Sequence, residues 1–143
     1  MAMATFLLKT EPDNYSYDDL VRDKRTHWDG VRNPTALMHM RTMKKGDEAF
    51  IYHTGKERRI AGLAKVVSDI YEDPDNPGLT GKGDLKGPLF DITPVKASTK
   101  DVTLADIKAD ERFADFDLVR LSRLSAMPVP PKLDKLLRRM AGL

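Results

Sequence analysis

One short segment, WDGVRN at residues 28–33, gathers side chains of several chemical kinds. It holds the only tryptophan of the chain together with a carboxylate, a guanidinium and a carboxamide. Asparagine is a good N-cap and proline suits the first helical position. Asn33 and Pro34 therefore predict the start of a helix whose free backbone N–H groups point back at the segment. An aromatic plane beside a helix N-terminus suits a flat, often anionic ligand, and a nucleotide fits that description.

Two further segments place polar side chains where an apolar run ends. KTEP at residues 9–12 follows the run ATFLL, and YHT at residues 52–54 follows the run EAFI. Binding groups commonly occur where an element leaves the core. We therefore expect these two segments and the WDGVRN segment to converge on one site.

A purely structural role is an alternative for each of these residues. A lone tryptophan often belongs to a core, so Trp28 could pack rather than bind. Asp29 and Arg32 could pair with each other, and Asn33 could serve only as a helix cap. Tyr52 could be a half-buried packing residue in an alternating strand. The residues alone leave these alternatives open.

The sequence lacks the common patterns for catalysis and metal binding. The histidines, His27, His39 and His53, are far apart and form no HExxH pair, and there is no cysteine. We therefore predict neither a metal site nor a cofactor. The GKG run at residues 81–83 opens no predicted helix and lacks the Lys-Ser/Thr ending of a phosphate-binding loop. No GxSxG elbow occurs, and we predict no catalytic residue.

Length and composition predict one domain, residues 1–143, with a core of its own. The lack of cysteine is compatible with a reducing compartment, so we expect a cytoplasmic location. The segment from Met1 lacks the basic and apolar regions of a secretory signal. No apolar run approaches the roughly 18 residues of a membrane span, so we expect no membrane partner.

Charge is unevenly distributed along the chain. The formal net charge of +2 is too small to indicate nucleic-acid binding by itself. Residues 118–143 carry one acid, Asp134, and six basic residues, which are Arg120, Arg123, Lys132, Lys135, Arg138 and Arg139. This segment predicts either a phosphate-facing surface or a solvated helix face.

Apolar and β-branched runs predict strands interspersed with short helices. The expected strands span residues 4–9, 48–53, 60–67, 89–96 and 123–129. The expected helices span residues 17–24, 36–43 with Gly46 at the end, 103–109 and 133–140. Residues 71–88, rich in proline and glycine, predict a long irregular excursion. Without a regular strand–helix alternation, the pattern predicts an α+β domain on a small, curved, mixed sheet.

An ordered set of motifs resembles the EVE domain family. The motifs are LLKTEP, WDGVRN, MKKGD, IYHTG, IAGLAKVV, FDITPVK and RLSAMPV, and they run from about Phe6 to Val129. The resemblance implies a PUA-like fold: a small mixed β pseudo-barrel of five or six strands with flanking short helices and a pocket that recognises a nucleobase. Members of the family are regarded as readers of modified bases, notably modified cytosines in DNA.

The resemblance also implies a base pocket formed by the KTEP, WDGVRN and YHT segments. Trp28 would stack on an extruded base, with Tyr52 as a second wall. Asp29 and Asn33 would read the base edge, and Thr10 would add a hydrogen bond. The expected ligand-binding residues are Lys9, Thr10, Glu11, Trp28, Asp29, Gly30, Val31, Arg32, Asn33, Tyr52, His53 and Thr54. The expected contacts to the nucleic-acid backbone come from Arg58, Arg59, Arg120 and Arg123.

The chain departs from the family pattern beside this expected pocket. Thr10 stands where the family usually has serine, and its added methyl group narrows the pocket. Pro34 and Thr35 stand where the family tends to have tyrosine and glutamine, so an aromatic and an amide contact are missing.

We therefore predict a non-catalytic nucleic-acid-binding domain that recognises a modified base, such as a modified cytosine, in DNA or RNA. One alternative is a small nucleoside amidohydrolase of the ASCH type, whose relatives use lysine, threonine and glutamate. On a regular strand Lys9 and Glu11 share one face and Thr10 the other, which weakens that alternative. Another alternative is a protein-interaction adaptor with a vestigial pocket. The sequence predicts neither the particular base nor the oligomeric state.

Overall fold

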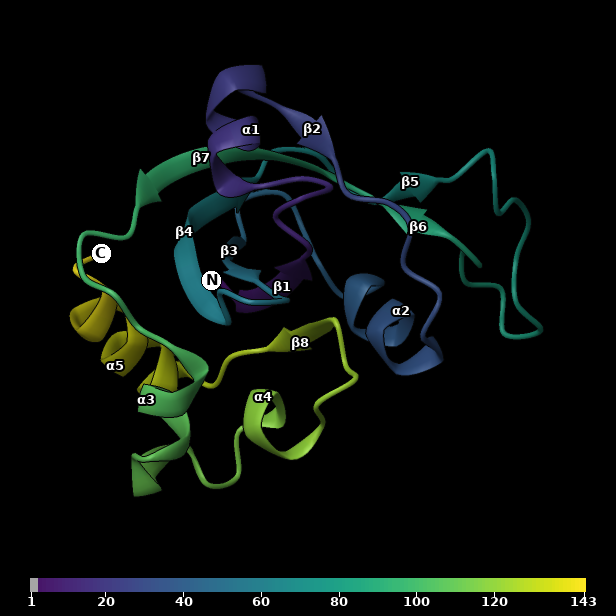
Figure 1. The fold of residues 1–143 in the computed structure, drawn as a ribbon. Helices are drawn as coiled ribbons and strands as arrows, with labels where there is room; N and C mark the ends of the chain where they lie inside the picture. The colour runs from purple at the N-terminus through teal and green to yellow at the C-terminus, as the bar shows by residue number, and fades with distance from the viewer. Residues whose placement is uncertain (1–2) are drawn as a thin grey trace.

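The computed structural model describes residues 3–143 and contains a six-stranded sheet that curls into a half-barrel (Figure 1). A two-stranded sheet accompanies it. Residues 1 and 2 lie outside the described residues. They belong to the N-terminal segment for which we expect no secretory signal. Every helix within residues 3–143 is too short or too polar to cross a membrane.

The strands and helices follow one another along the whole chain. The strands are β1 (Thr5–Thr10), β2 (Thr26–His27), β3 (Glu48–His53), β4 (Arg59–Val66), β5 (Tyr71–Glu72), β6 (Pro88–Leu89), β7 (Asp91–Ala97) and β8 (Ala126–Pro128). The α-helices are α1 (Tyr17–Asp23), α2 (Pro34–Met40), α3 (Leu104–Lys108), α4 (Asp117–Arg120) and α5 (Pro131–Ala141), and a 3-10 turn spans Glu111–Phe113.

The large sheet has the order β2-β7-β4-β3-β1-β8, in which only β1 and β3 are parallel neighbours. Their register pairs Thr5 with Glu48 and Thr10 with His53, so both strands end at one edge of the sheet. Figure 1 shows α1 above β7 and α2 beside the open side of the curl. Residues 28–33, which connect β2 to α2, cross that open side. The predicted small, curved, mixed sheet of an α+β fold is confirmed.

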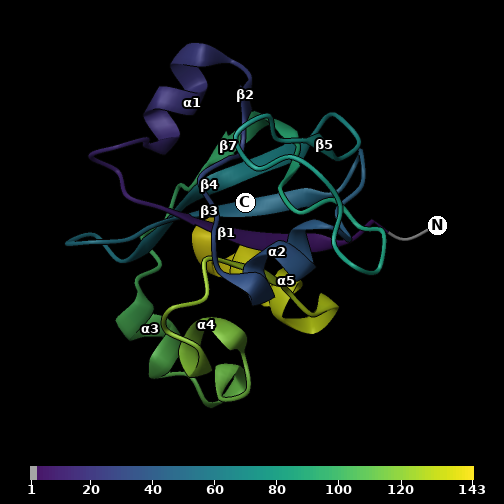
Figure 2. The same cartoon turned by 90° about the vertical axis from the view of Figure 1, so that its right-hand side faces the viewer.

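The central strands are buried on both faces, and this explains their continuous apolar sequences. In β3 every residue from Ala49 to His53 is buried. Figure 2 shows α5 lying under the sheet, and its residues Leu137 and Ala141 belong to the same core cluster as Phe50. The predicted strand at 48–53 therefore has its expected bounds.

Two helix starts follow directly from local sequence. Ser16 and Asp19 form a reciprocal capping box at the start of α1. Thr103 and Asp106 form the same arrangement at the start of α3. Each box satisfies backbone N–H groups that have no partner within the helix. The predicted helices at 17–24 and 103–109 are confirmed to within one residue at each end.

The second helix is shorter than predicted. It ends at Met40 rather than continuing through Met43 to Gly46. The backbone N–H groups of Thr42 and Met43 bond to carbonyls three residues back, which is turn geometry rather than an α-helix. Gly46 does not cap the helix, because its N–H group bonds to the Val66 carbonyl of β4.

Several other element boundaries differ from the prediction. The expected strand 89–96 is divided at Phe90 into β6 and β7, and the expected strand 123–129 pairs with β1 only over Ala126–Pro128. The pattern missed β2, α4 and the 3-10 turn. These elements have two to four residues, which is too short to show a periodic apolar pattern. The predicted irregular excursion over 71–88 holds only the short strand β5 and the first residue of β6.

Gly62 in β4 is packed directly against an aromatic ring. An ideal Cβ atom on Gly62 would lie 2.5 Å from Cζ of Tyr17. The Tyr17 hydroxyl donates a hydrogen bond to the Leu63 carbonyl at 2.7 Å, so the ring cannot move away freely. We expect Gly62→Ala to lower the free energy of unfolding by about 1–3 kcal/mol through overpacking, measured by urea denaturation.

The matched control is Gly81→Ala in the long loop. A Cβ atom there meets nothing within 4 Å, so stability should be unchanged or slightly raised. Equal urea midpoints for the two variants would contradict this packing analysis.

Candidate nucleic-acid interface

A pocket of about 420 Å³ lies between the end of β1 and the segment that crosses the open side of the sheet. We call it the Trp28 pocket. Its walls come from the end of β1, the turn after β1, β2 with the WDGVRN segment, and the residue before β8. The lining residues are Lys9, Thr10, Glu11, Asn14, Tyr15, Thr26, His27, Trp28, Asp29, Gly30, Val31, Arg32 and Ser125.

The strand order explains why distant segments meet at this pocket. Because β1 and β3 are parallel, residues 9–11 end beside residues 52–54. Strand β8 is antiparallel to β1, so Ser125 arrives at the same edge, and its carbonyl accepts the Lys9 backbone N–H at 2.9 Å. Residues 9–11 and 28–32 line this pocket and residues 52–54 do not, so two of the three segments expected to converge meet here.

Trp28 is both a core residue and a wall of the pocket. Its side chain is only 7% exposed and belongs to the main apolar cluster. Its backbone N–H donates to the Phe90 carbonyl at 2.9 Å, which fixes the start of the crossing segment against the sheet. Most of the indole is therefore committed to packing, and only a small part of its surface faces the pocket. Val31 in the same segment also packs against the core while lining the pocket.

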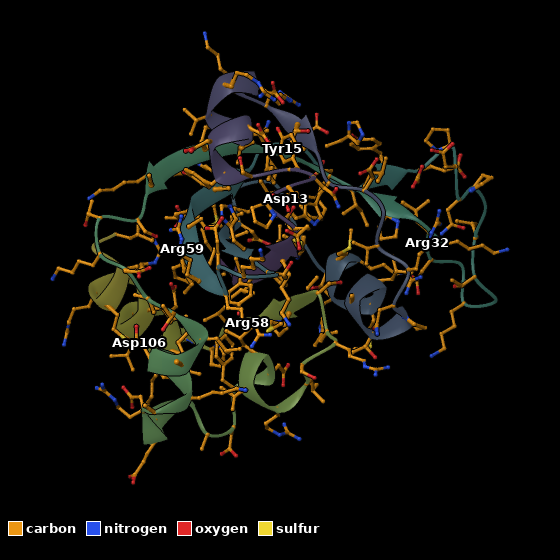
Figure 3. All side chains as sticks on the ribbon, viewed as in Figure 1. Asp13, Tyr15, Arg32, Arg58, Arg59 and Asp106 are labelled. Carbon is orange, nitrogen blue, oxygen red and sulfur yellow. The ribbon has the colours of Figure 1, made fainter. Side chains whose placement is uncertain are left out.

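Asp29 and Arg32 extend into solvent at the mouth of the pocket. Their alternative role as a mutual ion pair is wrong, because the Asp29 carboxylate lies 3.2 Å from Nε2 of His27. Arg32 forms no ion pair with any residue in the described part of the chain. Gly30 between them has a φ of +77°, the left-handed conformation that glycine adopts without strain. Figure 3 shows Arg32 next to α2.

Asn33 caps α2, and this changes the predicted role of the helix N-terminus. Its Oδ1 accepts the backbone N–H groups of Thr35 at 2.9 Å and Ala36 at 3.1 Å. Pro34 has no N–H, and the Leu37 N–H bonds to the Asn33 carbonyl. The prediction that free N–H groups point at the ligand is therefore wrong, because the first turn satisfies them itself.

Asn33 also lies outside the Trp28 pocket. With Arg120 and Arg123 it lines a separate hollow of about 340 Å³. Arg123 has no ion-pair partner among residues 3–143, and Arg120 lies 3.8 Å from Asp117. These two arginines therefore line this separate hollow and not the Trp28 pocket.

Tyr52 faces a second hollow rather than the Trp28 pocket. This hollow has a volume of about 280 Å³, and we call it the Tyr52 hollow. Tyr52 is 3% exposed, and burial raises the pKa of its hydroxyl, partly offset by the Arg58 charge. Lys9 lines both cavities, whereas Tyr52 lines only the second. The prediction that Tyr52 forms the second wall of one shared pocket is therefore wrong.

His53 has structural partners on both ring nitrogens. Nε2 accepts the backbone N–H of Tyr17 at 3.0 Å, and Nδ1 lies 3.0 Å from Glu57 Oε1. The side chain is 5% exposed, and it ties the start of α1 to β3 away from either cavity. Glu57 also accepts from Arg59 at 2.9 Å, which engages the predicted backbone-binding Arg59 in the same chain of contacts.

Hydrogen bonds order the turn that follows β1. The Thr10 hydroxyl donates to the Tyr15 carbonyl at 2.7 Å. The Glu11 carboxylate accepts the Thr54 hydroxyl at 3.3 Å and the Asp13 backbone N–H at 3.4 Å. The Thr54 backbone N–H also donates to the Thr10 carbonyl at 2.9 Å. Thr54 therefore contacts the Trp28 pocket only through Thr10 and Glu11, and it lines the Tyr52 hollow itself.

The sequence interpretation missed five residues of the Trp28 pocket. Tyr15 supplies the aromatic side chain that Tyr52 does not, and Figure 3 shows it between α1 and the turn that carries Asp13. Its hydroxyl donates to Asp23 at 2.9 Å. Closeness along the sequence could have identified these residues, because each of them lies within four positions of a recognised motif. The five are Asn14, Tyr15, Thr26, His27 and Ser125.

The basic C-terminal segment does not form one continuous surface. Arg138 is held by Asp134 at 2.6 Å and Glu48 at 2.9 Å, so its charge is compensated within the fold. Arg120 and Arg123 line the same hollow as Asn33. Lys132, Lys135 and Arg139 line a separate hollow on α5. Among residues 3–143, no cluster of histidine, aspartate and glutamate is arranged to hold a metal ion.

The curled mixed sheet with short flanking helices and a pocket at its open side defines a PUA-like protein. A sequence profile described as "EVE domain" matches residues 4–140, so the chain belongs to the EVE domain family. This confirms the resemblance inferred from the motifs.

Thymocyte nuclear protein 1 from two vertebrates is similar to the chain in sequence. The human protein is 34% identical over 73% of this chain and 55% of its own length. The Gallus gallus protein is 32% identical over 72% of this chain and 51% of its own length. The chain therefore spans about half the length of the curated relatives that it matches.

Solved structures agree with the fold. An NMR structure of a Rhodopseudomonas palustris protein has 38% identity and a TM-score of 0.87, covering 98% of this chain and 94% of that one. A crystal structure of human thymocyte nuclear protein 1 in complex with 5-methylcytosine-containing DNA has 29% identity and a TM-score of 0.83, covering 96% and 97%. An ASCH mutant protein from Zymomonas mobilis, at 14% identity and a TM-score of 0.65, shares the fold alone.

Because Asn33 caps α2, we expect its substitution to change the stability of the protein. Asn33→Ala should lower the free energy of unfolding by about 0.5–2 kcal/mol, because the Thr35 and Ala36 N–H groups lose their acceptor. Asn33→Ser keeps a capping oxygen and should restore most of that loss, measured by thermal and urea unfolding. If Asn33→Ser remained as unstable as Asn33→Ala, the cap would not be the source of the effect.

Proposed function

We propose that this chain is a non-catalytic domain that binds a modified base, 5-methylcytosine or a close analogue, extruded from DNA into the Trp28 pocket. The observation that carries the proposal is the composition of that pocket. An indole surface, an exposed carboxylate and an unpaired guanidinium lie within one five-residue stretch, Trp28 to Arg32. The crystal structure of human thymocyte nuclear protein 1 with 5-methylcytosine-containing DNA supports this choice of ligand.

Each pocket group has a chemical role in this proposal. The exposed part of Trp28 and the ring of Tyr15 contact the base through their apolar surfaces. The Asp29 carboxylate accepts the exocyclic amine of a cytosine. The Thr10 hydroxyl already donates to the Tyr15 carbonyl but retains acceptor capacity toward the base edge.

Arg32 is suited to the nucleic-acid backbone. Its guanidinium is exposed at the pocket mouth and has no carboxylate partner in the described residues. Extruding a base requires contacts that hold the flanking phosphates, and arginine provides them with planar, bidentate geometry. Arg32 would therefore contribute affinity without reading the sequence.

The contacts within the KTEP segment favour binding over hydrolysis. Lys9 Nζ donates to the Ser122 carbonyl at 3.0 Å. Thr10 donates to a backbone carbonyl, and Glu11 accepts from Thr54 and Asp13. All three side chains thus have partners that order the loop, and no pair of them forms the hydrogen bond of an activated nucleophile and base.

The test is a titration of labelled DNA duplexes monitored by fluorescence anisotropy. One duplex carries a single 5-methylcytosine and the other is unmodified. We expect the protein to prefer the modified duplex. Asp29→Ala should weaken binding to the modified duplex by about 1–3 kcal/mol, the cost of one base-edge contact. Arg32→Ala should weaken binding to both duplexes alike.

The control is Lys45→Ala, an exposed residue that lies before β3, at the edge of the sheet opposite to the pocket. It removes a positive charge and should leave both affinities unchanged at 0.15 M salt. Equal affinity for the two duplexes would contradict base recognition. Mass spectrometry of the recovered oligonucleotides should show no altered nucleoside, and a new product would instead support the hydrolase. Failure to bind any nucleic acid, with capture of a protein partner, would support the adaptor.

A further inference from the structure

The Tyr52 hollow is built differently from the Trp28 pocket beside it. Its base is the Tyr52 ring at the end of β3, and its sides come from the β3–β4 turn, α3, α4 and the residue two positions after α4. The lining residues are Lys9, Tyr52, Thr54, Gly55, Arg58, Leu104, Lys108, Leu118, Val119 and Ser122. Apolar side chains form the interior, and three cationic side chains join them.

No acidic side chain lines this hollow among the described residues. The three cations are Lys9, Arg58 and Lys108, and none forms an ion pair within residues 3–143. By contrast, Arg22 and Arg25, which line no cavity, each form an ion pair with a carboxylate. Three uncompensated positive charges around one cavity favour an anionic ligand.

Lys9 is the most constrained of the three cations. Its Nζ donates to the Ser122 carbonyl at 3.0 Å and lies 5.9 Å from the centre of the Tyr52 ring. An ammonium group has three donors, so two remain. Burial lowers the pKa of Lys9, because part of the ammonium group's hydration is lost. An anion placed against Nζ would compensate its charge.

Arg58 is held over the same hollow by an unusual backbone. Its φ of +45° is left-handed, and arginine rarely adopts that conformation. Nε donates to the Gly55 carbonyl at 3.2 Å, which leaves the terminal nitrogens free of protein partners among the described residues. Figure 3 shows Arg58 between the end of the sheet and α4. Lys108 approaches from the last turn of α3 on another side.

We propose that the Tyr52 hollow is a second nucleotide subsite that receives the nucleotide next to the base held in the Trp28 pocket. This inference rests on the proposed function. Because Lys9 lines both cavities, the phosphate that joins the two nucleotides lies at Lys9 Nζ. Arg58 and Lys108 hold the next phosphate, and the apolar surface of Leu104 and Val119 contacts the neighbouring sugar or base. Affinity for a strand then depends on both cavities, whereas preference for the modified base depends on the Trp28 pocket alone.

The test uses Lys108, an exposed residue in the last turn of α3 that has no role in base recognition. Lys108→Glu should weaken binding of the modified duplex several-fold and lower the slope of log affinity against log salt by about 1. Lys108→Arg keeps the charge and should bind as the unchanged protein does. The matched charge reversal Lys45→Glu, at the opposite edge of the sheet, should alter the salt slope less than Lys108→Glu does. The ratio of modified to unmodified affinity should stay constant in all three variants.

Backbone amide shifts in NMR provide an independent readout with two probes. The nucleoside 5-methyl-2′-deoxycytidine should shift only residues that line the Trp28 pocket. A trinucleotide with 5-methylcytosine at its centre should also shift residues 54–58, 104–108 and 118–122.

The outcomes separate the two proposals. A protein that prefers modified DNA but whose Lys108→Glu variant keeps the affinity and salt slope of the unchanged protein would overturn the second subsite and leave base recognition intact. A protein with no preference for modified DNA would overturn the proposed function itself. Trinucleotide shifts confined to the residues that line the Trp28 pocket would also overturn the second subsite.

Discussion

The parallel pairing of β1 with β3 is the constraint on which the candidate site depends. The other neighbouring strands of this curled sheet are antiparallel to each other. Because β1 and β3 are parallel, both strands end at the same edge of the sheet. The KTEP segment therefore lies beside the end of β3, and Ser125 joins it through the antiparallel strand β8. Residues 28–33 then close the open side of the curl and complete the Trp28 pocket. An antiparallel β1 would place Lys9 and Tyr52 at opposite ends of the sheet.

The structure separates groups that build the site from groups that are free to bind. Asn33 satisfies the first turn of α2, and His53 satisfies the start of α1, so both are engaged by the backbone. Most of Trp28 belongs to the core. Arg32 and Arg58, by contrast, form no ion pair among residues 3–143, and they line the two cavities. Recognition would therefore depend on side chains rather than on a helix N-terminus.

Local signals predicted much of the fold because they act over a few residues. Capping boxes at Ser16 and Thr103 gave the starts of α1 and α3, and the continuous apolar run of β3 gave its bounds. The family motifs identified the WDGVRN and KTEP segments as parts of one pocket. These features need no knowledge of which strands are neighbours.

The rest of the site depends on long-range geometry that a single sequence does not contain. Tyr52 lines the neighbouring hollow and not the Trp28 pocket, and no pattern along the chain indicates that. Tyr15 reaches the pocket because the Thr10 hydroxyl fixes the turn after β1. Strand β2 has two residues, too few to be recognised before its partner β7 is known.

The most direct measurement of the central claim is the emission of the single tryptophan during titration with a 5-methylcytosine-containing oligonucleotide. Because Trp28 lines the proposed base pocket, we predict a saturable change in its emission, at one base per protein, that follows the binding curve. The unmodified oligonucleotide should give a much smaller change at the same concentration. Full binding of modified DNA with unchanged tryptophan emission would contradict the claim that the base enters this pocket.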